Sequence, residues 1–124
     1  MIIDEEAGYL CGILKAKGCI TDYQFILSAK DKNLMEAIVE KIEKKFEITP
    51  QIKTLRKVWK DNGQYIFEEN GFMITINSKI ICNELKNLRE KNLSEYHEEK
   101  VRQAYLKGID DALKRRVIYD KNKN

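Results

Sequence analysis

The sequence has few of the residues that mark secreted, metal-binding or membrane proteins. It contains three cysteines, one proline and one histidine among 124 residues. An odd number of cysteines without a CxxC pair argues against a disulfide framework and against a zinc site. No stretch approaches the roughly 18 apolar residues that a membrane span needs, and the acidic start MIIDEEAGYL is unlike a signal peptide. We therefore expect a cytoplasmic protein that does not associate with membranes.

The sequence also lacks a strong charge of either sign. There are 23 Lys and Arg against 20 Asp and Glu, which gives a net charge of +3. A balance so close to neutral does not indicate a partner by itself, so the distribution of charge matters more than its total. The content of 43% hydrophobic and 35% charged residues is typical of one soluble domain with its own core.

Periodicity and turn signals predict an α+β domain. Apolar residues at helical spacing, each run preceded by an N-capping side chain, predict four helices at residues 4–17, 31–46, 78–90 and 94–117. Runs rich in β-branched and aromatic residues predict five strands at 19–20, 23–28, 50–60, 64–68 and 72–76, with glycine-containing turns at Asp61-Asn62-Gly63 and Asn70-Gly71. Strands grouped in hairpins between helices indicate an antiparallel sheet.

The first and last predicted helices carry the same ridge of small residues. Residues four positions apart lie on one face of a helix. The ridges are Gly8, Gly12 and Ala16 in the first helix, and Ala104, Gly108 and Ala112 in the last. Glycine inside a helix costs about 1 kcal/mol relative to alanine, so we interpret the ridges as the surface on which the two helices pack closely. The alternative is that each ridge packs separately against the sheet.

The strings around these ridges form an internal repeat. Residues 9–18, YLCGILKAKG, align without a gap with residues 105–114, YLKGIDDALK, and agree at tyrosine, leucine, glycine, isoleucine and alanine. Leu10 to Gly18 resembles the LAGLIDADG motif of homing endonucleases, and Leu106 to Lys114 resembles a second, more divergent copy. Segments 25–34, 74–79 and 101–117 resemble further parts of that family in the same order.

The resemblance implies the family's αββαββα repeat with an antiparallel sheet, followed here by an extra LAGLIDADG-like helix. Residues 1–124 would then be one domain, with a nearly complete repeat at 4–90 and the first helix of a second repeat at 94–117. In the family, two such helices pack at a two-fold or pseudo-two-fold axis, and the curved sheet of each repeat lies in the DNA major groove. The helices could therefore pair within one chain or in a homodimer.

The positions that the resemblance assigns to catalysis carry no acid. In the family, the eighth motif residue is an acid that holds a divalent metal at the scissile phosphate. Here that position is Lys17 in the first copy and Leu113 in the second, and neither side chain offers a carboxylate ligand. We interpret the nearby Asp110 and Asp111 as a solvated helix face or a structural ion pair. We therefore predict no catalytic residues, no metal, no cofactor and no enzyme activity; the alternative is a nuclease with rebuilt acids.

Basic residues concentrate in two places. The predicted strand 50–60 carries four of them around Trp59, with no acid among its residues: Lys53, Arg56, Lys57 and Lys60. They suit phosphate contact, although lysines also protect an edge strand from aggregation. The second group, Lys114, Arg115 and Arg116, lies at the end of the last predicted helix, where the helix dipole also favours cations. In the implied fold this end and Lys17 lie together at the DNA.

We therefore predict a nucleic-acid-binding protein that prefers double-stranded DNA and does not cleave it. The eight predicted contact residues are Lys17, Lys53, Arg56, Lys57, Lys60, Lys114, Arg115 and Arg116. Two alternatives stay open, because the sequence does not separate DNA from RNA. One is an RNA-binding protein, since some members of the family assist intron splicing as maturases. The other is a protein-interaction module in which the groove is vestigial.

Overall fold

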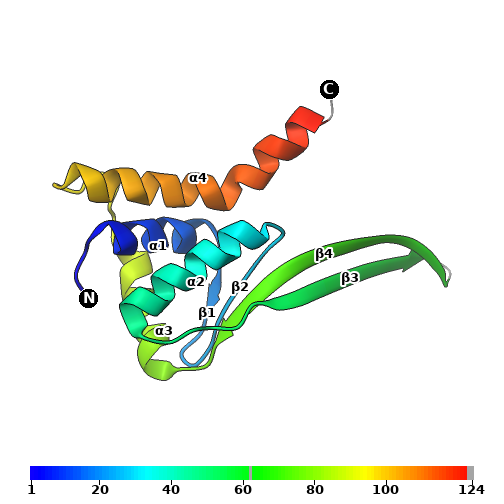
Figure 1. Ribbon diagram of the computed structural model, residues 1–124, viewed down its shortest axis with the longest axis horizontal. Coiled ribbons are helices and arrows are strands. Elements are labelled where there is room, and N and C mark those ends of the chain that lie inside the picture. Colours follow the sequence, from blue (N-terminus) through cyan, green and yellow to red (C-terminus); the bar gives the residue numbers. More distant parts are fainter. Residues whose placement is uncertain (62, 123–124) are drawn as a thin grey trace.

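A computed structural model describes the backbone of residues 1–61 and 63–122, and the side chains of residues 1–56, 63 and 71–113. This part of the chain forms an antiparallel sheet in the strand order β1-β2-β4-β3, together with the helices α1 to α4 (Figure 1). Helices α1 and α2 lie on one side of the sheet, and α4 lies on the outer side of α1 (Figure 1). The predicted α+β class and the order αββαββα with an extra helix are confirmed.

The first helix, α1 (Glu5–Ala16), begins where the sequence predicts. The Asp4 carboxylate accepts a hydrogen bond from the backbone N–H of Ala7 at 3.0 Å, which caps the helix. Gly18 follows the helix with a φ of +100°, a conformation that glycine adopts without a steric penalty. The chain can therefore turn at once into the short strand β1 (Cys19–Ile20).

The next two helices are also capped as predicted. α2 (Lys32–Phe46) begins after Asp31, and α3 (Lys79–Glu90) begins after Ser78; both side chains accept backbone N–H groups of the first turn. α2 packs against β2 and β4, while α3 packs against α1 and β1. Together with α1 these helices enclose one face of the sheet and leave the other face open.

The predicted strands 64–68 and 72–76 are one continuous strand, β4 (Gln64–Ile76), so the predicted turn at Asn70-Gly71 is wrong. The reason lies on the neighbouring strand: a Cβ on Gly71 would lie 3.4 Å from the carbonyl oxygen of Ala29, at the end of β2 (Phe25–Ala29). Glycine here permits a close approach of two strands rather than a turn. Because β4 pairs with β2 at residues 72–76 and with β3 at residues 64–73, the β3–β4 ribbon continues beyond the helices (Figure 1).

The last helix, α4 (Glu99–Asn122), begins and ends later than predicted. The Ser94 hydroxyl does not cap it, because that group bonds to the Asn92 side-chain oxygen at 2.7 Å and closes a local turn. This turn places Leu93 in the core, where only 2% of its surface is exposed. The link between α3 and α4 is therefore longer than the sequence indicates.

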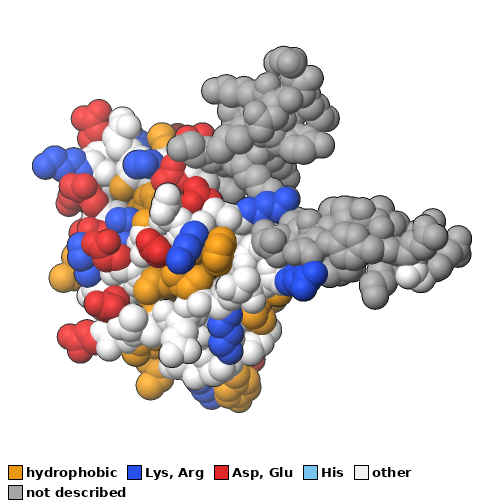
Figure 2. Space-filling view, turned by 45° about the vertical axis from the view of Figure 1, so that its right-hand side comes forward, with side chains coloured by type: hydrophobic (Ala, Val, Ile, Leu, Met, Phe, Trp, Pro, Cys, Tyr) orange, Lys and Arg blue, Asp and Glu red, His pale blue; other side chains and the backbone are white. Residues whose placement is uncertain are grey.

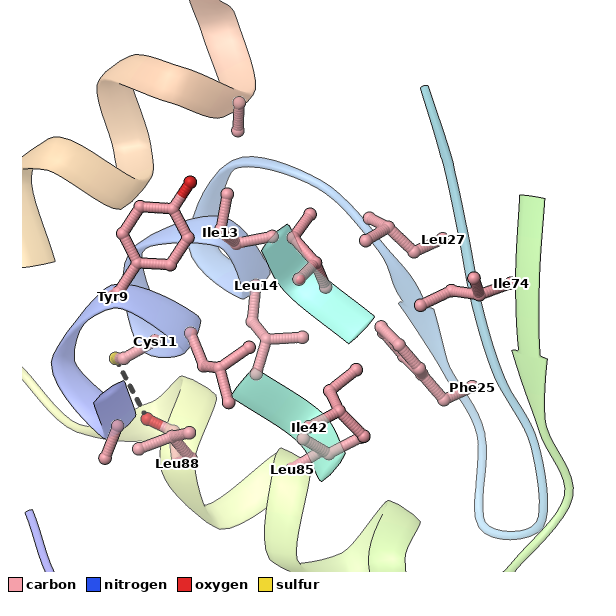
Figure 3. Close-up of a cluster of buried hydrophobic side chains, with 14 of the residues drawn as sticks. Tyr9, Cys11, Ile13, Leu14, Phe25, Leu27, Ile42, Ile74, Leu85 and Leu88 are labelled. Atoms are coloured by element: carbon pink, nitrogen blue, oxygen red, sulfur yellow. Dashed lines mark hydrogen bonds between the residues drawn. The ribbon is translucent and has the colours of Figure 1, made fainter. Parts of the chain in front are cut away.

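The core fills the space between the helices and the covered face of the sheet (Figure 3). Its largest buried side chains include Leu10, Ile13, Phe25, Leu27, Met35, Ile38, Ile42, Ile74, Leu85 and Leu88. Cys11 and Cys82 are buried among them, as predicted. The Cys11 thiol donates to the Leu88 carbonyl oxygen at 3.1 Å, and burial raises the pKa of that thiol to about 11. Among the described residues, no helix has the length and apolar character that crossing a membrane requires.

Candidate nucleic-acid interface

The two small-residue ridges meet within the chain. α1 and α4 run side by side in the same direction (Figure 1). A Cβ on Gly12 would overlap the carbonyl oxygen of Tyr105 and lie 2.8 Å from the backbone nitrogen of Ile109. A Cβ on Gly108 would likewise overlap the carbonyl oxygen of Tyr9. Neither position has room for a side chain, so the two backbones are in direct contact at the crossing.

The crossing has a local two-fold symmetry that the sequence repeat shares. Tyr9 and Tyr105 are 96 positions apart, and so are Gly12 and Gly108. When the two copies are exchanged by this shift, the contact of Gly12 with Tyr105 becomes the contact of Gly108 with Tyr9. Each helix therefore presents the same surface to the other, as in an interface between identical subunits.

The other ridge residues lie on the same two helices. A Cβ on Gly8 would lie 2.8 Å from the carbonyl oxygen of Val101, which extends the close contact toward the start of both helices. Ala112 is buried, while Ala16 and Ala104 are partly buried against the core. The predicted ridges are thus joined inside one molecule, and neither is left open to a second copy.

A polar contact holds one side of this crossing. The Tyr9 hydroxyl donates to Asp111 Oδ2 at 2.7 Å, and Lys107 Nζ lies 3.2 Å from the same oxygen. Burial of the Tyr9 hydroxyl, followed by its carboxylate partner, raises the pKa of Tyr9 well above its ordinary value. Asp111 is therefore a structural ion-pair residue and Asp110 is exposed, which agrees with the prediction for both.

The two eighth motif positions differ in their place on the helices. Lys17 is the C-cap of α1, whereas Leu113 lies within α4, which continues to Asn122. The predicted basic run 114–116 is therefore inside the helix, and the helix dipole gives no local reason for its charge. The side chains of Lys114, Arg115 and Arg116 lie outside the described residues.

The face of the sheet that the helices leave open carries both polar and apolar side chains. Successive residues of a strand point to opposite faces, and cross-strand partners share a face. Phe25 and Leu27 point into the core, so Ile26 and Ser28 point to the open face. The described strand residues of the open face are Cys19, Ile26, Ser28, Lys53, Leu55, Gly71, Met73 and Thr75. None of these eight residues is an acid.

Two amide side chains lie where the open face ends. Gln24 precedes β2 and Asn77 follows β4, and Gln24 Nε2 donates to Asn77 Oδ1 at 3.0 Å. The sequence prediction missed this pair, together with Ser28 and Thr75 on the neighbouring strands. The available signal was the alternation of these polar residues with Phe25 and Leu27, because alternation separates the two faces of a strand.

The four basic residues predicted on β3 (Lys53–Asp61) do not form a single surface. Lys53 pairs with Met73 and is exposed on the open face. Arg56 is also exposed, but it is three positions further along the strand and therefore lies on the opposite face. The side chains of Lys57 and Lys60 are outside the described residues, and a register shift precedes Lys60. The prediction grouped these residues because they are close in the sequence, but alternation along the strand places Lys53 and Arg56 on opposite faces.

Charge is unevenly distributed over the described surface. In Figure 2 the Asp and Glu side chains lie mainly on the left of the molecule, over the helices, whereas Lys and Arg side chains also occur toward the right. Some acids of the helices pair with lysines, as Glu6 does with Lys41 at 3.0 Å. Among its described strand residues, the open face of the sheet carries no negative charge that would repel a phosphate backbone.

No family model and no curated protein matches the chain. Solved structures that resemble it are those of I-DmoI in complex with DNA and Ca, at a TM-score of 0.55 and 14% identity over 89% of this chain and 58% of that chain. The complex with DNA and Mn has a TM-score of 0.53 and 14% identity over 90% and 63% of the two chains. Mesophilic variants of the homing endonuclease I-DmoI match with a TM-score of 0.53 and 14% identity, over 89% of this chain and 62% of that chain.

The fold is that of the LAGLIDADG homing endonucleases. The present chain spans about three fifths of the length of the I-DmoI chains that it matches, between 58% and 63%. At 14% identity the likeness concerns the arrangement of helices and strands. It agrees with the fold that the LAGLIDADG-like strings imply.

This comparison corrects one prediction. The lack of acids at Lys17 and Leu113 led to the expectation that the protein is not an enzyme. The solved structures with this fold are of a homing endonuclease, which is an enzyme, so that expectation is contradicted. The physical weakness of the expectation is that it judged the whole molecule by two positions of one motif.

The calcium and manganese ions of the I-DmoI complexes raise the question of a metal site in this chain. Lys17 and Leu113 supply no oxygen ligand of the kind that hard divalent cations prefer. Within the part of the chain that the structure describes, no three His, Cys, Asp or Glu side chains form a group able to hold a metal ion. The described residues do not fit a metal at the paired helices.

Proposed function

We propose that the protein binds nucleic acid through the open face of its sheet, and that its partner is double-stranded DNA. The observation that carries this proposal is the composition of that face, which has hydrogen-bonding side chains and Lys53 but no acid among its described residues. The fold supports it as well, because the similar I-DmoI structures were solved in complex with DNA.

The dimensions of the sheet suit a duplex. β4 has 13 residues, and at about 3.3 Å per residue it is about 43 Å long. One turn of B-DNA is about 34 Å long, so the sheet can follow slightly more than one turn. A two-stranded ribbon such as β3–β4 fits the major groove, which is about 12 Å wide.

The residues of the face divide by chemistry. Gln24 and Asn77 carry amides, which can accept and donate to base edges, and an amide pairs well with adenine. Ser28 and Thr75, further along the same two strands, add hydroxyl groups. Lysine and arginine suit phosphates. Arg56 lies on the opposite face and is left out of the proposed phosphate contacts, which are Lys17, Lys53, Lys57, Lys60, Lys114, Arg115 and Arg116.

The test is a binding titration at two salt concentrations. Fluorescence anisotropy with labelled duplex DNA, single-stranded DNA and an RNA hairpin should give the highest affinity for the duplex. The logarithm of the binding constant should fall linearly with the logarithm of salt concentration, because counterions are released. Tighter binding of the RNA hairpin would favour the maturase-like alternative, and no binding of any probe would favour the protein-interaction alternative.

A single substitution locates the site. Lys53→Ser should weaken duplex binding and reduce the salt slope by about one phosphate contact. The matched control is Lys100→Ser, which changes an exposed lysine at the start of α4. Helix α4 lies on the far side of α1 from the sheet (Figure 1). If both variants keep the affinity and the salt slope of the unmodified protein, the open face is not the binding surface.

A further inference from the structure

The outer faces of the two paired helices differ in chemistry. The side of α1 that points away from α4 is built into the core, and its residues Ala7, Leu10, Cys11 and Leu14 are at most 4% exposed. The shift of 96 positions that relates the two copies of the repeat gives the corresponding residues of α4. These are Gln103, Leu106, Lys107 and Asp110, and all four are exposed.

These differences between α1 and α4 determine whether another part of a protein can pack on the outer face of α4. In α1 the four positions are apolar because the sheet and the helices of the repeat pack on them. In α4 one position carries an amide and two carry charges, and a buried charge without a partner is strongly unfavourable. Leu106 is the one apolar residue of the four, at 49% exposure, so no continuous apolar patch is left on these positions. A second sheet or a second copy of the repeat has no core-forming surface here.

The inner face of α4 leads to the same conclusion. Gly108 packs against the backbone of α1, and Ala112 on the same ridge is buried. The Tyr9 hydroxyl donates to Asp111 across this contact. In a homodimer of the family type this place on α1 would belong to the helix of the partner. Here the chain's own α4 occupies this place. One side of α4 packs against α1, and the other side is exposed to solvent.

We infer that α4 closes the fold, so that the protein is a monomer that recognises one half-site of duplex DNA. This inference rests on the proposed function. The local two-fold axis between α1 and α4 has a sheet on one side and an exposed polar helix face on the other. One molecule therefore contacts a single block of about ten base pairs, which is one turn of the duplex, rather than two inverted blocks.

The first measurement is the mass of the free protein. Sedimentation equilibrium of the full chain at micromolar concentrations, at low and at high salt, should give a single species of 14.6 kDa. A reversible dimer at these concentrations would overturn the inference.

The second measurement is a selection from duplexes whose randomised centre is longer than two turns. The recovered sequences should share one block without inverted symmetry, and the complex should contain one protein per duplex. Two inverted blocks at a fixed spacing, bound by two protein molecules, would overturn the inference while leaving DNA binding intact. The absence of any enrichment together with an absence of duplex binding would instead count against the proposed function.

A third experiment replaces the polar residues on the outer face of α4 by apolar residues like those at the corresponding positions of α1. The variant Gln103→Ala, Lys107→Ala, Asp110→Leu is expected to self-associate. The control changes three exposed residues of α2 that have the same spacing along a helix, as Glu36→Ala, Glu40→Ala, Glu43→Leu, and should stay monomeric. A monomeric first variant, or equal association of the two, would show that the polar face of α4 does not set the oligomeric state.

Discussion

The crossing of α1 and α4 provides the most quantitative prediction. Gly12→Ala adds one carbon, which would overlap the Tyr105 carbonyl oxygen and lie 2.8 Å from the Ile109 nitrogen. Carbon and backbone polar atoms approach to about 3.3 Å, so the helices must separate by roughly 1 Å. A gap of that size forfeits about a quarter to a half of the dispersion energy of each contact across the interface.

The expected cost follows from these distances. Overpacking of a tight core costs about 1–3 kcal/mol, while alanine gains about 1 kcal/mol over glycine in helix propensity. The crowding groups are backbone atoms, which cannot rotate away, so we expect the overpacking cost to lie near its upper end of about 3 kcal/mol and the net loss to be about 2 kcal/mol. For a domain of this size the midpoint of thermal unfolding, followed by circular dichroism, should fall by roughly 6–12 °C.

A graded series makes this prediction refutable. Gly108→Ala should cost about as much as Gly12→Ala, because the crossing is symmetric, and Gly8→Ala should cost less. Gly71→Ala is the matched control, since its Cβ would meet the Ala29 carbonyl oxygen at an ordinary 3.4 Å. Equal melting temperatures for the Gly12, Gly108 and Gly71 variants would mean that the two helices do not touch as described.

Three further predictions concern titrating groups. Because the pKa of Tyr9 is raised in the fold, the contribution of Tyr9 to stability is complete below about pH 10 and declines above it. Tyr9→Phe should lower the free energy of unfolding in urea by about 1 kcal/mol at pH 7, and should weaken the decline of stability at alkaline pH. Partial burial raises the pKa of Asp4, but hydrogen bonds from Lys45 and the helix N-terminus outweigh it and leave the pKa lowered. Asp4→Ala should therefore cost about 1 kcal/mol at pH 7, and progressively less as the pH falls through the lowered pKa of Asp4. With a thiol reagent at pH 8, exposed Cys19 should react quickly while buried Cys11, with its pKa near 11, reacts only on unfolding.

Much of the fold could be predicted because its signals are local. Asp4, Asp31 and Ser78 cap helices through side chains that bond within three residues, and a short sequence window contains both partners. Gly71 shows where such windows fail. Its neighbour Asn70 makes a turn signal, but Gly71 lies inside β4 beside the backbone of Ala29, which is far away in the sequence.

The candidate site was harder to predict than the fold. The basic residues of β3 attract attention because they are close in sequence, yet the pleat of a strand places Lys53 and Arg56 on opposite faces. Gln24 and Asn77 are 53 positions apart, and pairing of β2 with β4 brings them together. The helix ridges were easier to recognise, because each ridge repeats at a helical spacing and the two copies can be aligned with each other.

The contact between α1 and α4 also fixes when the molecule can be completed during synthesis. The groups that meet at the crossing, such as Gly12 and Gly108, are separated by 96 positions. At about 5–20 residues per second, the ribosome needs roughly 5–20 s to make the chain between them. Throughout that interval the ridge of α1 has no helix to cover it, because α4 emerges after the sheet and the other described helices. Docking of α4 therefore follows the formation of the other described elements, and the amide hydrogens of α4 should be among the first in the helical layers to exchange with solvent.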